Sequence, residues 1–179
     1  FRKALKTDDG RVHAAPPEFV NRARDLLAEQ HPQTPPGYPF VLGNQRARHS
    51  MNSMLNELPG LHPSGKDNPA VIHPDDAAVL GIYEGDRVRL FSPIGEIETT
   101  ATLSDRPRRG MVIMNHGWGS GVFDPRGGAD PEYHGVNRNL LIDGGKIDPL
   151  SQTPALSSSY VALQKVIATS PDYPPDHDG

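Results

Sequence analysis

Residues 68–90 carry the clearest structural signals of the chain and read Asn68-Pro-Ala-Val-Ile-His-Pro-Asp-Asp-Ala-Ala-Val-Leu-Gly-Ile-Tyr-Glu-Gly-Asp-Arg-Val-Arg-Leu90. Residues 70–73 read as a short strand. Residues 74–81 predict a helix of one to two turns, because a proline and two aspartates suit its first turn and a glycine suits its end. His73 sits at the N-cap position, for which we predict local capping rather than metal binding. Charged and apolar side chains alternate over residues 87–91, as in a half-buried strand.

Further short strands are expected on both sides of this stretch. They fall at residues 38–42, 96–103, 111–114 and 160–166. Residues 87–91 and 96–103 predict a β-hairpin with one wet face, on which Arg87, Arg89, Glu96 and Glu98 can pair across the strands. About six short strands, two short helices and long polar loops predict a closed, mixed β-barrel rather than a doubly wound sheet.

The composition restricts the classes of function. The 179-residue chain holds 18 glycines and 19 prolines, which disfavours a bundle of long helices. Its net charge of −4 gives no global basic field, so we expect no nucleic-acid partner. The absence of cysteine excludes disulfides, cysteine-bound metals and a thiol nucleophile. No apolar run approaches the roughly 20 residues that span a bilayer, so we expect no membrane insertion by this chain.

The two ends of the chain differ from its middle. Residues 1–37 predict a hairpin around Asp9-Gly10, a helix from Pro16-Pro17 to about Gln30 and a proline-rich linker from residue 31. This segment would join a preceding domain, and its helix either packs on the following domain, which we favour, or covers a domain missing from this chain. A compact domain is expected over residues 38–168 and a disordered tail over 169–179. The chain begins with Phe1, which suggests a piece of a longer protein.

A loop rich in hydrogen-bond donors follows the first expected strand. Two arginines carry permanent charge on planar donor forks that suit phosphate, and Gly43 lets the backbone turn or approach a ligand. The residues of this candidate anion site are Gly43, Asn44, Gln45, Arg46, Arg48, His49, Ser50, Asn52 and Ser53. From this stretch alone, an ordinary solvated loop remains an alternative. A short helix over residues 51–58, capped by Ser50 or Asn52, would point its amides at the ligand.

Two other polar segments could lie at the same face. One is the glycine-rich loop at residues 115–121, which contains His116, Gly117 and the only tryptophan. It permits close backbone approach to a ligand, or it is an irregular loop that packs Trp118 on the core. The other is Asn137-Arg138-Asn139, either a third donor-rich spot or a polar turn before a buried run.

Taken together, these residues resemble a known family. The 68–90 stretch, followed by Ile94-Gly-Glu-Ile97 and Pro107-Arg-Arg-Gly-Met-Val112, is similar to the C-terminal molybdopterin-dinucleotide-binding domain of the dimethyl sulfoxide reductase superfamily. That superfamily includes formate dehydrogenases and nitrate reductases. Asn137-Arg-Asn-Leu-Leu141 with Asp148-Pro-Leu-Ser151 resembles the closing motif of that domain. The resemblance covers about residues 38–167 and implies a six-stranded double-psi β-barrel of the aspartate-decarboxylase-like type.

The resemblance also implies a cofactor and a set of contacts. The cofactor is molybdopterin guanine dinucleotide, whose molybdenum or tungsten is held by other domains of an oxidoreductase. Its pterin and phosphates would contact the loop from Gly43 to Ser53, His116-Gly117 and Asn139. No catalytic residue and no metal ligand is expected in this chain, which alone should be inactive. Its partners would be the remaining domains of the catalytic subunit.

Two alternatives stay open on the sequence. The same barrel occurs in adaptors and decarboxylases, so the chain could be a binding or assembly module without a metal cofactor. It could also be a separate small subunit that associates with a larger catalytic subunit. The sequence departs from the family pattern at Ser157-Ser158-Ser159, where the family often has a lysine.

Overall fold

The computed structural model describes residues 4–28, 34–48, 50–55, 67–119, 135–154 and 159–167. Its described strands are β1 (Phe40–Gln45), β2 (Ala70–Ile72), β3 (Arg87–Phe91), β4 (Glu96–Leu103), β5 (Met111–Asn115) and β6 (Ser159–Lys165). The tail predicted at residues 169–179 and the serines at 157 and 158 lie outside these ranges, as does His49 of the predicted anion site.

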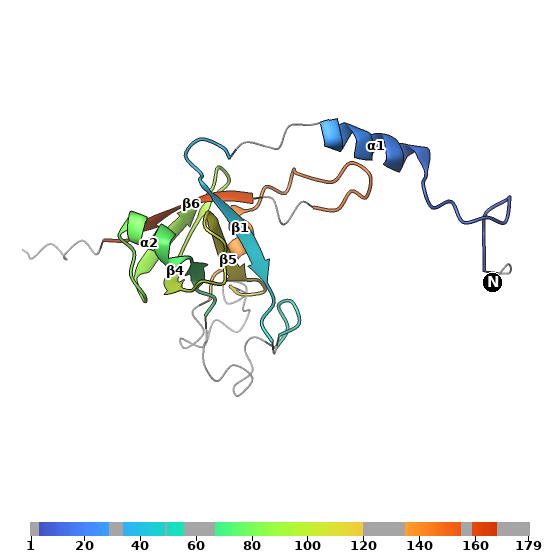
Figure 1. The fold of residues 1–179 in the computed structure, drawn as a ribbon. Coiled ribbons are helices and arrows are strands. Elements are labelled where there is room, and N and C mark those ends of the chain that lie inside the picture. The colour runs from blue at the N-terminus through green and yellow to red at the C-terminus, as the bar shows by residue number, and fades with distance from the viewer. Residues whose placement is uncertain are drawn as a thin grey trace, which may run out of the picture.

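The six described strands close into a barrel with the order β1-β5-β2-β4-β3-β6 (Figure 1). Strands β1 and β5 run parallel, as do β2 and β4. Strand β6 completes the ring because it pairs antiparallel with both β1 and β3. This mixed barrel confirms the expected six-stranded double-psi β-barrel.

Alternation of apolar and polar side chains places the core inside the barrel. Val88 and Leu90 of β3 are fully buried, and Ile97 and Ala101 of β4 lie within the same core. The hairpin between β3 and β4 forms as predicted, and its wet face carries the expected ion pairs. Arg87 lies 3.6 Å from Glu98, and Arg89 lies 3.4 Å from Glu96.

The small helix α2 (Pro74–Leu80) begins and ends as its sequence predicts. His73 Nδ1 accepts a hydrogen bond from the Asp75 N–H at 3.2 Å, which confirms its capping role. Gly81 ends the helix in the left-handed region, at φ 64°. A 3₁₀ helix, η2 (Arg138–Leu141), follows Asn137, whose side-chain oxygen accepts from the Asn139 N–H at 3.0 Å.

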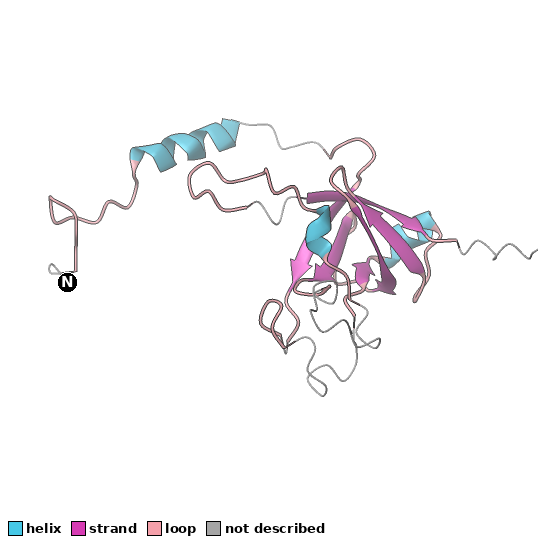
Figure 2. Ribbon diagram, turned by 180° about the vertical axis from the view of Figure 1, so that it is seen from behind, coloured by secondary structure: helices cyan, strands magenta, loops and turns pink. Residues whose placement is uncertain are grey.

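The N-terminal segment differs from expectation in two ways. Helix α1 (Pro17–Ala28) forms but has no buried residue, and it lies apart from the barrel (Figures 1 and 2). The barrel therefore does not cover the apolar side of α1, since Leu27 is 87% exposed, and the contact of α1 with the following domain is electrostatic, between Arg22 and Asp148. Residues 4–15 contain a turn closed by the Gly10 N–H bond to the Thr7 carbonyl, but no strand. A two-stranded hairpin with no third strand or packed face is too weak to persist.

The region after β1 also requires correction. Strand β1 extends to Gln45, because its pairing with β5 continues as far as the pair Gln45–Asn115. The loop therefore starts at Arg46. The predicted helix over residues 51–58 is replaced, in the described part, by a tight turn that pairs Met51 with Met54. Asn52 has φ 55° there, and Met51 and Met54 are about half exposed, so the helical spacing of the apolar residues has no surface to pack on.

Candidate functional site

The parallel pairing of β1 and β5 brings two polar loops together. Gln45 and Asn115 are the last residues of these strands and lie opposite each other. Since parallel strands end at the same edge, the chain leaves that edge as the 46–55 loop from β1 and as the 116–119 loop from β5. The resulting site, which we call the loop end of the barrel, joins segments about 70 residues apart in the sequence.

His116 connects the two loops at their start. Its Nδ1 lies 3.0 Å from Asn44 Oδ1 and 3.2 Å from the Gln45 carbonyl oxygen, and its Nε2 lies 3.3 Å from Asn52 Oδ1. A backbone carbonyl can only accept, so the contact with Gln45 requires a hydrogen on Nδ1. The imidazole thus lies in contact with Asn44 at the strand end and with Asn52 at the turn.

Gly117 lets the loops approach more closely than a side chain would allow. Its φ is 87°, and a Cβ at this position would lie 1.9 Å from the Asn52 carbonyl oxygen. Gly119 has the same function toward the third polar segment, because a Cβ there would lie 2.4 Å from the Asn137 backbone nitrogen. The glycines around His116 therefore serve contact between backbones, and all three segments meet at the loop end.

Asn68 fastens the third segment to the end of β5. The side chain is fully buried, and its Nδ2 donates to the carbonyl oxygens of Asn115 at 3.0 Å and Val136 at 2.9 Å. Its Oδ1 accepts from the Val136 N–H at 2.7 Å. Asn68 precedes β2, which runs antiparallel to β5, so the topology places it beside Asn115. Our site prediction missed this residue, because its burial depends on that pairing.

The predicted cationic residues are exposed at the loop end. Arg46 and Arg48 are both exposed, and within the described ranges neither guanidinium takes part in an ion pair or hydrogen bond. Gly43, Asn44 and Gln45 belong to β1, and Gln45 Oε1 accepts from Arg106 Nη2 at 3.1 Å. Ser50 and Ser53 lie in the 46–55 loop. Asn139 is exposed on η2.

Two further polar side chains at this end were not among the predicted site residues. Asn115 Oδ1 is buried without a hydrogen-bond partner, and so are Nε and Nη2 of Arg138. Burial lowers the pKa of the Arg138 guanidinium. Trp118 is 7% exposed and packs against Gly135, so its ring is buried beside the third polar segment.

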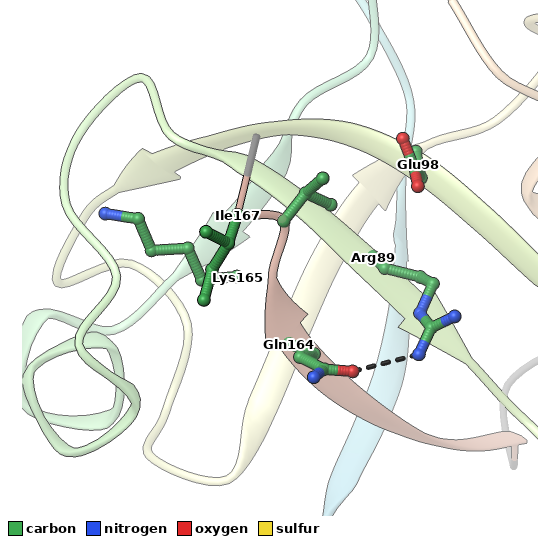
Figure 3. A pocket seen from close by; sticks show the side chains of 6 residues that line it. Arg89, Glu98, Gln164, Lys165 and Ile167 are labelled. Atoms are coloured by element: carbon green, nitrogen blue, oxygen red, sulfur yellow. Dashed lines mark hydrogen bonds between the residues drawn. The ribbon is translucent and has the colours of Figure 1, made fainter. Parts of the chain in front are cut away.

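A depression on the barrel wall is distinct from this site. Its volume is about 280 Å³, and it lies among Arg89, Glu98 and the end of β6 (Figure 3). The polar groups there are already paired: Arg89 Nη2 donates to Gln164 Oε1 at 2.9 Å, and Lys165 Nζ lies 2.6 Å from Asp86 Oδ2. Because these polar groups are paired with one another, they stabilise the barrel wall and none of these described groups is left for a ligand.

Within the described ranges, no cluster of three or more His, Asp or Glu side chains is placed to hold a metal ion. In the same part of the chain, no helix has the length and apolar character needed to cross a bilayer. The chemistry offered by the loop end is hydrogen bonding and positive charge. Such a set of groups is suited to an anionic, hydrogen-bonding ligand.

A closed barrel that gathers donor-rich loops at one end defines a ligand-binding domain. The family described as "Molydopterin dinucleotide binding domain" matches residues 40–160, and the chain belongs to this family. Trimethylamine-N-oxide reductase 1 of Escherichia coli (strain K12) is 31% identical over 140 residues, which is 74% of this chain and 16% of that protein. The Haemophilus influenzae trimethylamine-N-oxide reductase is 26% identical over 147 residues, 75% of this chain and 17% of the relative. The chain thus spans about one sixth of these relatives.

A solved structure agrees on the fold. Acetylene hydratase from Pelobacter acetylenicus superposes with a TM-score of 0.60 at 20% identity, over 72% of this chain and 18% of that one. The side chains at the loop end also fit the dinucleotide that the family binds. Exposed arginines suit its phosphates, and the buried, unpaired Asn115 Oδ1 suits an N–H group of a heterocycle.

Proposed function

We propose that this chain is the cofactor-binding barrel of a larger molybdenum or tungsten oxidoreductase and that its loop end holds molybdopterin guanine dinucleotide. The observation that supports this most strongly is the meeting of three donor-rich segments, from β1, β5 and η2, at one end of the barrel. The family match and the length of the relatives agree with it. The barrel would occupy residues 38–168, and residues 1–37 would form the junction with a preceding domain.

The roles of the residues follow from their chemistry. Arg46 and Arg48 bind the diphosphate, because guanidinium forks match phosphate oxygens. Asn52, His116 and Asn139, with the backbone of Gly43 and Gly117, hydrogen-bond the pterin or the diphosphate. The same assignment includes the neighbouring polar residues Asn44, Gln45, His49, Ser50 and Ser53. When bound, the metal dithiolene supplies the redox chemistry, and this chain contributes binding and orientation.

The partners of the barrel would be the remaining domains of the catalytic subunit. Alternatively, the chain is a separate small subunit that associates with a larger catalytic subunit. In either case the chain alone would be inactive, because neither a metal ligand nor a substrate pocket is assigned to it. Nucleic acid and membrane are not among the proposed partners, since the net charge is −4 and the loop end is cationic only locally.

Extraction of the native protein tests this function. The full-length protein that carries this chain is purified and denatured, and the released small molecules are separated by chromatography while the metal is measured by mass spectrometry. We expect guanosine nucleotide together with molybdenum or tungsten. If neither is present in protein from a host that makes the cofactor, the chain is a binding or assembly module of another kind.

A further inference from the structure

Arg138 is a buried cation without a counterpart among the residues that the structure describes. Its side chain is only 3% exposed, although it belongs to the short helix η2 near the surface. Its Nε and Nη2 atoms are buried and have no hydrogen-bond partner in the described part of the chain. The two neighbouring asparagines differ from it, because Asn139 is exposed and Asn137 caps η2 with its own side chain.

Such an arrangement is unfavourable unless an acceptor is supplied. Guanidinium keeps its proton in proteins, so it cannot escape the burial by becoming neutral. Burial lowers the pKa of Arg138, which reflects how poorly the charge is solvated there. Buried donors in native proteins are almost always paired, and a buried charge is tolerated when a counter-ion completes it. The protein in its working state therefore needs an anionic acceptor beside Arg138.

The position of Arg138 indicates which acceptor this is. The preceding residues are fixed to the site, because Asn68 bonds Val136 and Gly119 packs on Asn137. Asn115, which Asn68 also holds, has its own unpaired buried Oδ1. The unpaired donors of Arg138 and the unpaired acceptor of Asn115 therefore belong to two segments that the side chain of Asn68 connects. Both segments lie at the loop end, where the ligand is proposed to bind.

We propose that Arg138 is a further ligand-binding residue at the loop end, whose guanidinium pairs with a phosphate oxygen of the bound dinucleotide. This inference rests on the proposed function. It assigns to Arg138 an inner contact with the ligand, in contrast to Arg46 and Arg48, which are exposed. A carboxylate elsewhere in the full-length protein has similar chemistry and must be distinguished by experiment.

The test compares Arg138→Met with Arg138→Lys in the full-length protein, purified from hosts with and without synthesis of the cofactor. Methionine keeps the length and apolar stem of the side chain and removes the charge. We expect Arg138→Met to lower the guanosine nucleotide per protein at least tenfold, and Arg138→Lys to restore part of it. In protein without cofactor, Arg138→Met should melt at the same temperature as the wild type or higher, because an unpaired buried charge is removed. Arg109→Met, which alters an arginine that is 66% exposed, is the matched control and should retain the nucleotide.

Each contrary result has one meaning. If Arg138→Met retains the nucleotide, Arg138 does not bind it, and the inference is overturned. If the cofactor-free variant instead melts several degrees below the wild type, the partner is a carboxylate of the protein, and the inference is overturned as well. If wild-type protein from the producing host contains no guanosine nucleotide, the proposed function itself fails, which is seen before any variant is compared.

Discussion

The side-chain amide of Asn68 forms two hydrogen bonds with the backbone of Val136, its Nδ2 donating to the carbonyl oxygen at 2.9 Å and its Oδ1 accepting from the N–H at 2.7 Å. This pairing imitates the contacts of a neighbouring strand. It holds the segment before η2 against the end of β5, where the same Nδ2 also donates to Asn115. The geometry of the loop end thus depends on a buried side chain outside the loops themselves.

Asn68→Ala should therefore destabilise the barrel. The change leaves two carbonyl oxygens and one N–H without their partner in a buried place, and each such group costs about 1–3 kcal/mol. We expect the free energy of unfolding to fall by about 3 kcal/mol or more when the chain is unfolded in urea. Asn21→Ala on the exposed surface of α1 is the control and should change stability little. Equal stabilities for both variants would show that the Asn68 bonds contribute nothing net.

Gly117→Ala should disturb the site more than Gly85→Ala. The two glycines have similar positive φ values, 87° and 81°, so alanine introduces comparable backbone strain at both. A Cβ on Gly117 would collide with the Asn52 carbonyl at 1.9 Å, whereas a Cβ on Gly85 would meet nothing within 4 Å. In the full-length protein, we expect only Gly117→Ala to reduce the bound cofactor severely. A similar loss in both variants would attribute the effect to strain alone.

His116→Ala should loosen the 46–55 loop while the barrel stays folded. The imidazole contacts Asn44, Gln45 and Asn52, and none of these side chains belongs to the core. We expect faster hydrogen–deuterium exchange of the loop amides and a nearly unchanged melting temperature. His13→Ala in the N-terminal segment should leave exchange in the loop unaltered. Unchanged exchange in His116→Ala would mean that the loop is held by other contacts.

Asp86→Asn should remove a contribution to the folding stability that the wild type has at neutral pH and loses in acid. A hydrogen bond from Lys165, at 2.6 Å, is the main cause that holds the pKa of Asp86 below its usual value, and the Tyr83 N–H adds to it. A carboxylate with a lowered pKa in the folded state stabilises fully above the unfolded value of about 3.9 and loses that contribution as pH falls through the lower, folded pKa.

The melting temperature of Asp86→Asn should therefore lie below that of the wild type at pH 7. The gap should close as the pH decreases below about 4. The exposed Asp105 provides the control, because Asp105→Asn removes an acid that has no ion pair in the described ranges. A gap that persists unchanged in acid would show that the ion pair with Lys165 does not carry the effect.

Local signals in the sequence were sufficient for α2 and for the β3–β4 hairpin. The proline and aspartates of the first turn, His73 before it and Gly81 after it act within one or two turns of chain. The hairpin follows from alternation, which needs no information beyond the two strands. The helix predicted at residues 51–58 is not formed in the described part of that range, because apolar spacing stabilises a helix only where another surface covers its apolar face.

The candidate site depended on contacts that local patterns do not contain. The pairing of Gln45 with Asn115 joins distant strands, and it turned three expected loop residues into strand residues. Arg138 was visible as part of a donor-rich triplet, but its burial could not be read from polar neighbours. The family resemblance supplied the barrel and the cofactor, whereas the partners of His116 and Asn68 required the structure.

Cofactor binding at the loop end is tested by the cofactor content of the Arg46→Ala, Arg48→Ala double variant in the full-length protein. Each arginine–phosphate bond contributes about 1.5–3 kcal/mol, so loss of both should weaken binding by a factor on the order of 100 or more. Arg87→Ala with Arg89→Ala removes the same charge from the barrel wall, where both arginines pair with glutamates, and is the matched control. We predict that metal and guanosine nucleotide are lost from the Arg46, Arg48 variant and retained in the control. Full cofactor content in the Arg46, Arg48 variant would contradict the role assigned to the loop end.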